Sequence, residues 1–221
     1  AAYPFLSCRP EALEGEDTFM HPSWRTKAVG KRVFCLGKET TYRFLEGVLD
    51  EVCELFPDEY VHLGGDEAPI WNWKSCANCQ ERIRRLRLKD EVALKHFAMR
   101  HFADYVILKG RTPIVWDDDS AEAGLSKKTI VMVWHEPEDA EAVMNNGYRV
   151  IMTPNRFCYL DYLEKPSIED VRTFNPFKSI SEANWNKVVG VQCCNWTEGT
   201  LDESDLMVKM WPRASVFGMW R

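Results

Sequence analysis

Apolar residues recur along most of the chain at spacings that alternate between helix and strand. The stretch from Lys38 to Phe56 has helical spacing and ends at Pro57, and a short apolar run from Tyr60 to Leu63 predicts a strand. Further strands are expected at 112–116, 130–134, 149–152 and 188–194. Further helices are expected at 91–108, at 137–146 with Gly147 as its C-cap, and at 203–216 with a break at Pro212, while residues 1–37 are mostly loop.

This alternation predicts an α/β fold with a parallel sheet that helices cover on both faces. Three strands lead directly into polar and aromatic residues, namely Asp66-Glu67, Trp116-Asp117 and the segment 195–198. Such residues at the carboxyl ends of strands are typical of the catalytic face of a (β/α)8 TIM barrel. A doubly wound open sheet is the alternative, but no Gly-rich phosphate loop supports it.

The number of strands is too small for a closed barrel of this kind. Only five are found where eight are needed, and they occupy nearly all of the 221 residues. We therefore interpret residues 1–221 as one partial catalytic barrel domain that lacks its early strands. The open sheet would expose two edges and an apolar inner face, which a homodimer or a partner chain would complete.

Composition narrows the class of protein. The net charge of −6 argues against binding to nucleic acid or to an anionic membrane, because phosphate binding needs a basic surface. No apolar run is long enough to span a bilayer, and no signal peptide is visible at the N-terminus. The aromatic fraction of 12% suits either a packed core or a sugar site, since a flat ring stacks on the apolar face of a pyranose.

The chain has eight cysteines, and two of them form a Cys76-x-x-Cys79 pair. That spacing is half of a zinc ribbon, but no second pair of Cys or His follows at a suitable distance. A local disulfide, or two thiols at the start of a helix, is favoured over zinc, and we expect no metal. A bridge between Cys8 and Cys35 that joins two loops is a further possibility, which spacing does not establish.

The stretch His62-x-Gly64-Gly65-Asp66-Glu67 is the most informative for chemistry. Two glycines let the backbone turn sharply at the strand end, and two adjacent carboxylates follow. Because like charges oppose simultaneous ionisation, one carboxyl group can retain its proton near neutral pH and serve as a general acid. The alternative is a capping Asp beside a solvated Glu. His62 either orients a carboxylate or is a core histidine, and the second interpretation is favoured.

With its flanks, this stretch resembles the signature of glycoside hydrolase family 20, the β-N-acetylhexosaminidases. The similarity continues in order through residues 1–8, 34–67, 190–198 and 211–214. It implies a retaining mechanism in which the 2-acetamido group of the substrate is the nucleophile, with no cofactor or metal. Glu67 would then be the acid/base, and Asp66 would orient and stabilise the acetamido group.

The resemblance also implies a sugar pocket built from aromatic and acidic residues. Trp116 and Trp134 would enclose the methyl of the acetamido group, and Tyr159 would hydrogen-bond the acetamido oxygen. Trp196 would stack under the sugar ring. Asp161 and Glu198 would bind sugar hydroxyls. Trp134 and Trp196 have an alternative as core residues, and Asp161 has one as a turn cap.

Some residues depart from the family pattern. Trp116-Asp117-Asp118 stands where the family usually has Trp-Asp-Glu, which shortens one carboxylate at the pocket rim. An Arg and a His supplied by early segments of the family are not found in this chain. The resemblance implies N-acetylhexosamine glycans as substrates and an extracytoplasmic location. The competing hypothesis is a catalytically incompetent barrel fragment that binds sugar weakly at most.

Overall fold

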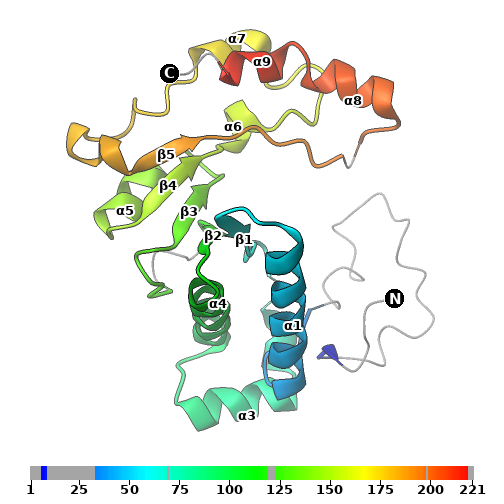
Figure 1. The fold of residues 1–221 in the computed structure, drawn as a ribbon, viewed down its shortest axis with the longest axis vertical. Helices are drawn as coiled ribbons and strands as arrows, with labels where there is room; N and C mark the ends of the chain where they lie inside the picture. Colours follow the sequence, from blue (N-terminus) through cyan, green and yellow to red (C-terminus); the bar gives the residue numbers. More distant parts are fainter. Residues whose placement is uncertain (1–5, 9–32, 69, 119–122, 198, 219–221) are drawn as a thin grey trace. The chain divides into compact units, whose positions relative to one another are not determined.

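The computed structural model describes residues 6–8, 33–68, 70–118, 123–197 and 199–218 (Figure 1). The chain divides into two compact units. The first contains Ala1–Thr112 and Glu122–Ser126, and the second contains Pro113–Ala121 and Lys127–Arg221.

The first unit is mainly helical and contains one short strand. Its elements are α1 (Glu39–Leu55), β1 (Tyr60–His62), α2 (Trp71–Lys74), α3 (Ala77–Leu86) and α4 (Glu91–Leu108). The predicted helices 38–56 and 91–108 are confirmed as α1 and α4. Asp90 caps α4, because its side chain accepts the Ala93 backbone N–H at 2.8 Å. Apolar periodicity did not predict α2, which is a single turn, or the extent of α3. The expectation of two thiols at the start of a helix agrees with α3, for which Cys76 is the N-cap.

An aromatic contact joins α1 to α4 in the core of this unit. Tyr42 is buried and stacks on Phe102 with ring centroids 5.4 Å apart, while Arg82 of α3 lies 4.4 Å above the Tyr42 ring. Trp73 of α2 is buried in the same core, and its indole N–H donates to the Phe34 carbonyl at 2.9 Å. These contacts bind the short helices α2 and α3 to the long pair.

The second unit holds a parallel sheet in which strand order follows chain order. Its elements are β2 (Thr112–Trp116), β3 (Ile130–Val133), α5 (Asp139–Asn145), β4 (Arg149–Met152), α6 (Asn155–Cys158), α7 (Ile168–Thr173), the 3-10 helix η4 (Glu182–Lys187), β5 (Val188–Val191), α8 (Glu203–Met210) and α9 (Arg213–Phe217). All three pairings from β2 to β5 are parallel. Every residue of β3 is buried, as expected for a strand that helices or other layers cover on both faces.

The predicted α/β class is confirmed, and the structure corrects some boundaries. The strand predicted at 188–194 ends at Val191, and the connection after β4 contains the short elements α6, α7 and η4 rather than loop alone. The predicted break at Pro212 separates α8 from α9. At the end of α5, Gly147 has a φ of +89° and donates to the Met144 carbonyl, while Tyr148 donates to Val143. This is the Schellman arrangement that a C-terminal glycine permits.

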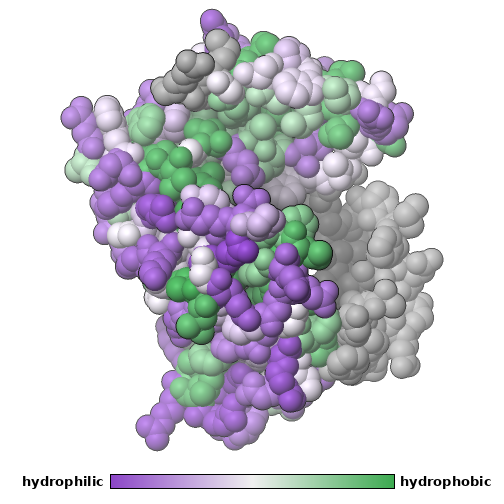
Figure 2. All heavy atoms as spheres, in the orientation of Figure 1, coloured by the Kyte–Doolittle hydropathy of each residue, from purple (hydrophilic) through white to green (hydrophobic). Residues whose placement is uncertain are grey.

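Other expectations concern the surface and the cysteines. Among the described residues, none of the helices combines the length and apolar character that a bilayer span requires. Figure 2 shows mostly hydrophilic side chains over α1 and α3 in the view drawn.

All eight cysteines are free thiols, so neither of the two disulfides considered from spacing is present in this structure.

Two glycines of the first unit offer a matched test of its packing. A Cβ on Gly37 would lie 2.1 Å from the Asn78 carbonyl carbon, whereas one on Gly47 of α1 would meet nothing within 4 Å. Gly37→Ala should therefore destabilise the unit by about 1–3 kcal/mol through overpacking. Gly47→Ala should stabilise it by about 0.5–1 kcal/mol, because alanine suits a helix interior better than glycine. Urea unfolding curves measure both, and equal effects of the two substitutions would contradict the packing.

Candidate functional site

The adjacent carboxylates Asp66 and Glu67 follow a glycine turn and lie four and five residues beyond the end of β1. Gly64 and Gly65 have φ values of +72° and +99°, which glycine adopts at little cost. Gly65 also lies against α4, where an added Cβ would be 2.7 Å from the Met99 methyl carbon. Both carboxylate side chains are exposed. Glu67 itself has a φ of +43°, an uncommon backbone conformation for a residue with a side chain and one that is enriched at functional sites.

The residues before and after this turn are held in place by packing and by a hydrogen bond. Leu63 and Ala68, which flank the turn, pack against the buried core of the first unit. The Gly64 backbone N–H donates to Nδ1 of His62 at 3.0 Å. His62 is exposed to solvent, yet the atoms packed around its ring lower its pKa to about 4, so the predicted core histidine is not fully buried. Its ring instead holds the first residue of the turn.

Four aromatic side chains form a cluster in the second unit, which we call the aromatic cluster: Trp116, Trp134, Tyr159 and Trp196. The Trp134 and Tyr159 rings are nearly parallel, with an interplanar angle of 12° and centroids 6.3 Å apart. Trp196 meets Tyr159 edge-on with ring centroids 5.5 Å apart, and it lies tilted against Trp116 with centroids 5.8 Å apart. The structure therefore brings together all four aromatic residues that sequence analysis assigned to a sugar pocket.

Strand periodicity and backbone pairing explain this cluster. Side chains two apart on a strand share a face, so Trp134 continues the apolar face of Ile130 and Met132, and Trp116 is paired with Met132. Past the strand ends, the Leu160 N–H donates to the Cys194 carbonyl at 2.7 Å, and the Cys194 N–H donates to Cys158 at 2.9 Å. These bonds continue the parallel pairing into the loops that carry Tyr159 and Trp196.

The exposure of the tryptophans decides between pocket and core. Trp196 is 46% exposed, so it is not a core residue, and Trp134 is half-buried. Trp116 is 8% exposed and closes the buried end of the cluster. A partly open aromatic surface of this kind can receive the apolar face of a ligand.

Asp161 joins the aromatic cluster to a polar group. One carboxylate oxygen, Oδ1, accepts the Trp196 backbone N–H at 2.5 Å from 35 residues away, so Asp161 does not merely cap a local turn. The other oxygen, Oδ2, is buried and has no hydrogen-bond partner in the structure. A buried carboxylate oxygen without a donor is costly, and a ligand hydroxyl would relieve that cost. Glu198 lies outside the described residues.

Sequence analysis did not assign a role to three polar residues beside the cluster. The Trp134 indole N–H donates to Asp118 at 2.7 Å, so the shortened carboxylate of the Trp116-Asp117-Asp118 segment positions the ring. Asp117 faces His135, with Oδ1 and Nδ1 3.3 Å apart. Burial raises the pKa of Asp117, and the facing His135 opposes that rise. Ligand atoms of Asp117, Asp118 and His135 lie within 4.8 Å of one another, as exposed acidic groups often do without a metal.

Arg213 of α9 supports the segment that carries Tyr159 and Asp161. Its buried guanidinium donates to the carbonyls of Pro166 at 2.7 Å and Leu160 at 3.4 Å, and its Nε donates to Lys209 at 3.0 Å. Burial lowers the pKa of Arg213, and the negative charge of Asp161 opposes that change. Only the three-dimensional contact reveals this role, because Arg213 is 47 residues from Pro166 in sequence.

The fold and these residues define a class of protein. The first unit carries an exposed carboxylate pair on a turn beyond a strand end, and the second carries an aromatic cluster at the ends of parallel strands. Each of these two features is by itself typical of (β/α)8-barrel glycosidases, and comparison with known proteins identifies the family. The model of the catalytic domain of glycosyl hydrolase family 20 matches residues 1–220. The chain therefore belongs to glycoside hydrolase family 20.

Individual relatives agree with this assignment. A β-hexosaminidase of Porphyromonas gingivalis is 34% identical over 212 residues, which are 90% of this chain and 26% of the relative. A β-N-acetylhexosaminidase structure from Bacteroides fragilis is 29% identical with a TM-score of 0.78, over 97% of this chain and 44% of that one. An exo-β-N-acetylglucosaminidase structure from Vibrio harveyi, in complex with N-acetylglucosamine, is 25% identical with a TM-score of 0.77, over 85% and 32% respectively. The chain thus spans between a quarter and a half of these relatives, and the five strands found among its described residues correspond to part of their barrel.

The support from Arg213 can be measured directly. Arg213→Met removes donors from three buried carbonyl contacts, and leaving such groups without a partner should lower the free energy of unfolding by more than about 2 kcal/mol. Arg172→Met is the matched control, because Arg172 is exposed and pairs only with Glu169 in its own helix. It should change stability by about 0.5 kcal/mol or less. Urea midpoints distinguish the two, and an unchanged midpoint for Arg213→Met would contradict the supporting role.

Proposed function

We propose that this chain carries the acid/base and much of the sugar pocket of a β-N-acetylhexosaminidase that removes terminal N-acetylglucosamine or N-acetylgalactosamine residues. The observation that carries the proposal is the exposed Asp66-Glu67 pair, held on a glycine turn beyond the end of β1. Family membership and the aromatic cluster support it. The partners would be N-acetylhexosamine glycans.

The first step uses the substrate as its own nucleophile. The acetamido oxygen attacks the anomeric carbon and forms a C–O bond, while the bond from that carbon to the leaving oxygen breaks. Glu67 donates its proton to the leaving oxygen, so the departing group leaves as a neutral alcohol. The intermediate is a cyclic oxazolinium ion attached to the sugar.

The second step reverses the proton transfer. Glu67, now a carboxylate, takes a proton from a water molecule that attacks the anomeric carbon, and the oxazolinium ring opens to restore the acetamide. The configuration of the sugar is retained because the anomeric carbon is inverted twice. Throughout, Asp66 accepts a hydrogen bond from the acetamido N–H and stabilises the positive charge that develops on that group. Adjacent carboxyl groups would then have complementary roles, one as an anion and one as an acid.

The remaining residues would bind the sugar. Trp116 and Trp134 enclose the acetamido methyl, and Tyr159 donates its hydroxyl to the acetamido oxygen. Trp196 stacks under the pyranose, and its exposed face suits that contact. Asp161 would direct its buried Oδ2, which has no partner, to a sugar hydroxyl. Glu198 would bind hydroxyls on the far edge of the ring.

Two further expectations belong to this proposal. The sheet of the family is a closed barrel, so further strands, from a homodimer or a partner chain, would complete the pocket. Members of the family act mostly outside the cytoplasm, and we propose the same location here. Because further strands would complete the pocket, hydrolysis should be assayed with the full natural chain as well as with residues 1–221.

The acid/base role predicts a specific loss of activity. Glu67→Gln should lower kcat/KM for an oligosaccharide with a terminal N-acetylglucosamine by roughly 100- to 10,000-fold, because the leaving sugar hydroxyl has a high pKa and the amide cannot donate the required proton. The loss should be much smaller for an aryl leaving group of low pKa, which departs without protonation. Glu54→Gln, at an exposed position of α1, is the control and should retain full activity.

Three results would discriminate among the hypotheses. Equal losses for both leaving groups would argue against Glu67 as the acid, and unchanged activity in Glu67→Gln would exclude it. Absence of activity in residues 1–221 together with activity in the full natural chain would show that these residues alone form an incompetent fragment. That outcome would leave the assignment to glycoside hydrolase family 20 unchanged.

Participation of the acetamido group predicts a second, independent result. A thiazoline analogue, which mimics the cyclic intermediate, should inhibit far more strongly than a plain glucoside that lacks the acetamido group, by a factor of roughly 100 or more. Asp66→Asn should weaken thiazoline binding more than glucoside binding, because Asp66 faces the acetamido group in this mechanism. Inhibition constants measure both effects. Equal and weak binding of the two compounds would contradict substrate assistance.

A further inference from the structure

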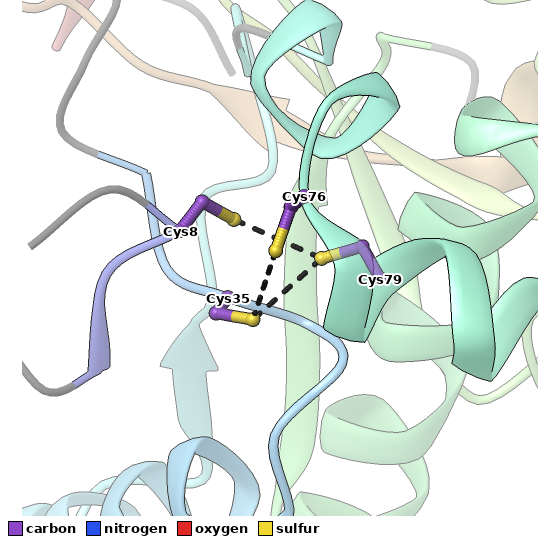
Figure 3. Close-up of side chains that lie close together, drawn as sticks. All are labelled: Cys8, Cys35, Cys76 and Cys79. Carbon is purple, nitrogen blue, oxygen red and sulfur yellow. Dashed lines mark hydrogen bonds between the residues drawn. The ribbon is translucent and has the colours of Figure 1, made fainter.

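Four cysteines from three separate segments converge in the first unit. We call Cys8, Cys35, Cys76 and Cys79 the cysteine cluster, and Figure 3 shows their sulfur atoms directed toward one another. All four sulfurs lie within 4.8 Å of each other, and three of the residues are buried while Cys8 is partly so. The shortest separations are 3.5 Å for Cys35–Cys76 and 3.7 Å for both Cys35–Cys79 and Cys8–Cys79.

These separations fit a metal better than disulfides. A disulfide joins two sulfurs at about 2.05 Å and gives each cysteine one partner. Here Cys35 is 3.5 Å from Cys76 and 3.7 Å from Cys79, and Cys79 is also 3.7 Å from Cys8, so neither Cys35 nor Cys79 has a single close partner. In a tetrahedral site with Zn–S bonds of about 2.3 Å, the sulfurs are about 3.8 Å apart. The cysteine cluster is therefore close to the size and shape of a Zn(Cys)4 site.

The surrounding backbone holds the ligand segments in this arrangement. Cys76 precedes the first residue of α3 and Cys79 lies in its first turn, where backbone N–H groups favour thiolates. The backbone of Gly37 hydrogen-bonds the Cys35 sulfur, and a side chain at that position would collide with the backbone of Asn78. Hydrogen bonds of this kind orient metal-bound ligands.

The segment that supplies Cys8 is tied to the segment that supplies Cys35. Ser7 and Phe34 form an antiparallel bridge, and the Cys35 N–H donates to the Leu6 carbonyl at 2.7 Å. Lys38 donates its ammonium to the Ser7 carbonyl at 3.2 Å, which places a positive charge close to the chain at Cys8. The segments that supply Cys8 and Cys35 are thus held together by backbone contacts as well as by contacts of their sulfurs.

We propose that the cysteine cluster binds one structural Zn²⁺ ion. Four thiolates leave no open position on the metal, so the ion would stabilise the fold and would take no part in chemistry. Cys35, Cys76 and Cys79 belong to the same buried core on which Leu63 and Ala68 pack. The zinc would therefore brace the region that carries Asp66 and Glu67. The inference stands independently of the proposed hydrolysis.

Metal content and thermal stability test this site in the full natural chain. Purification without chelator should yield about one zinc per chain, and X-ray absorption should show four sulfur neighbours at about 2.3 Å. Removal of the ion with a chelator under reducing conditions should lower Tm, and addition of Zn²⁺ alone should restore it. Replacement by Co²⁺ should give the visible absorption bands of a tetrahedral cobalt thiolate.

Variants locate the ligands. Cys35→Ser and Cys79→Ser should lose the zinc, whereas Cys53→Ser should keep it, because Cys53 lies in α1 outside the cysteine cluster. If the ligand variants do not fold, the measurements on the unsubstituted protein decide the question. Reduced metal-free protein whose Tm does not respond to Zn²⁺, or alkylation that finds the four cysteines in disulfides after purification, would overturn the proposal.

Discussion

Parallel pairing of strands is the constraint on which the second unit depends. Because β2 to β5 all run in the same direction, their carboxyl ends lie at one edge of the sheet. The pairing continues into the loops through backbone hydrogen bonds between Leu160, Cys194 and Cys158. These bonds fix the relative positions of residues that are far apart in sequence. Tyr159 and Trp196 meet for this reason. A pocket that was built only on unpaired loops would lack such positional control.

The first unit depends on a different interaction, which is close backbone packing around a small core. Gly37 allows the segment that carries Cys35 to approach the start of α3, and this approach gathers the thiols. The same core supports the residues on either side of Asp66 and Glu67. Stability of the core and placement of the proposed acid/base are therefore linked. A metal bound by the thiols would act on both at once.

The polar residues beside the aromatic cluster show how one change in side-chain length is accommodated. The family resemblance implied a longer carboxylate where this chain has Asp118, and yet Asp118 accepts the Trp134 indole N–H at 2.7 Å. The carboxylate of Asp117 is held by the ring of His135. These contacts fix the orientation of a ring that the proposed pocket uses. They depend on where β2 and β3 end relative to each other, which is a property of the register.

The sequence by itself determined the major elements, the α/β class, the glycine turn with Asp66 and Glu67, and the aromatic residues at strand ends. Those features follow from local periodicity and from turn chemistry, which are encoded within a few residues. It did not reveal the short helix α2, the extent of α3, the support from Arg213, or the exposed position of His62. Only the tertiary structure decided these, and only it assembled the cysteine cluster, in which Cys8 and Cys79 are 71 residues apart. The physical reason is that ligand sets and buried hydrogen bonds depend on which segments pack together, and no local pattern records that packing.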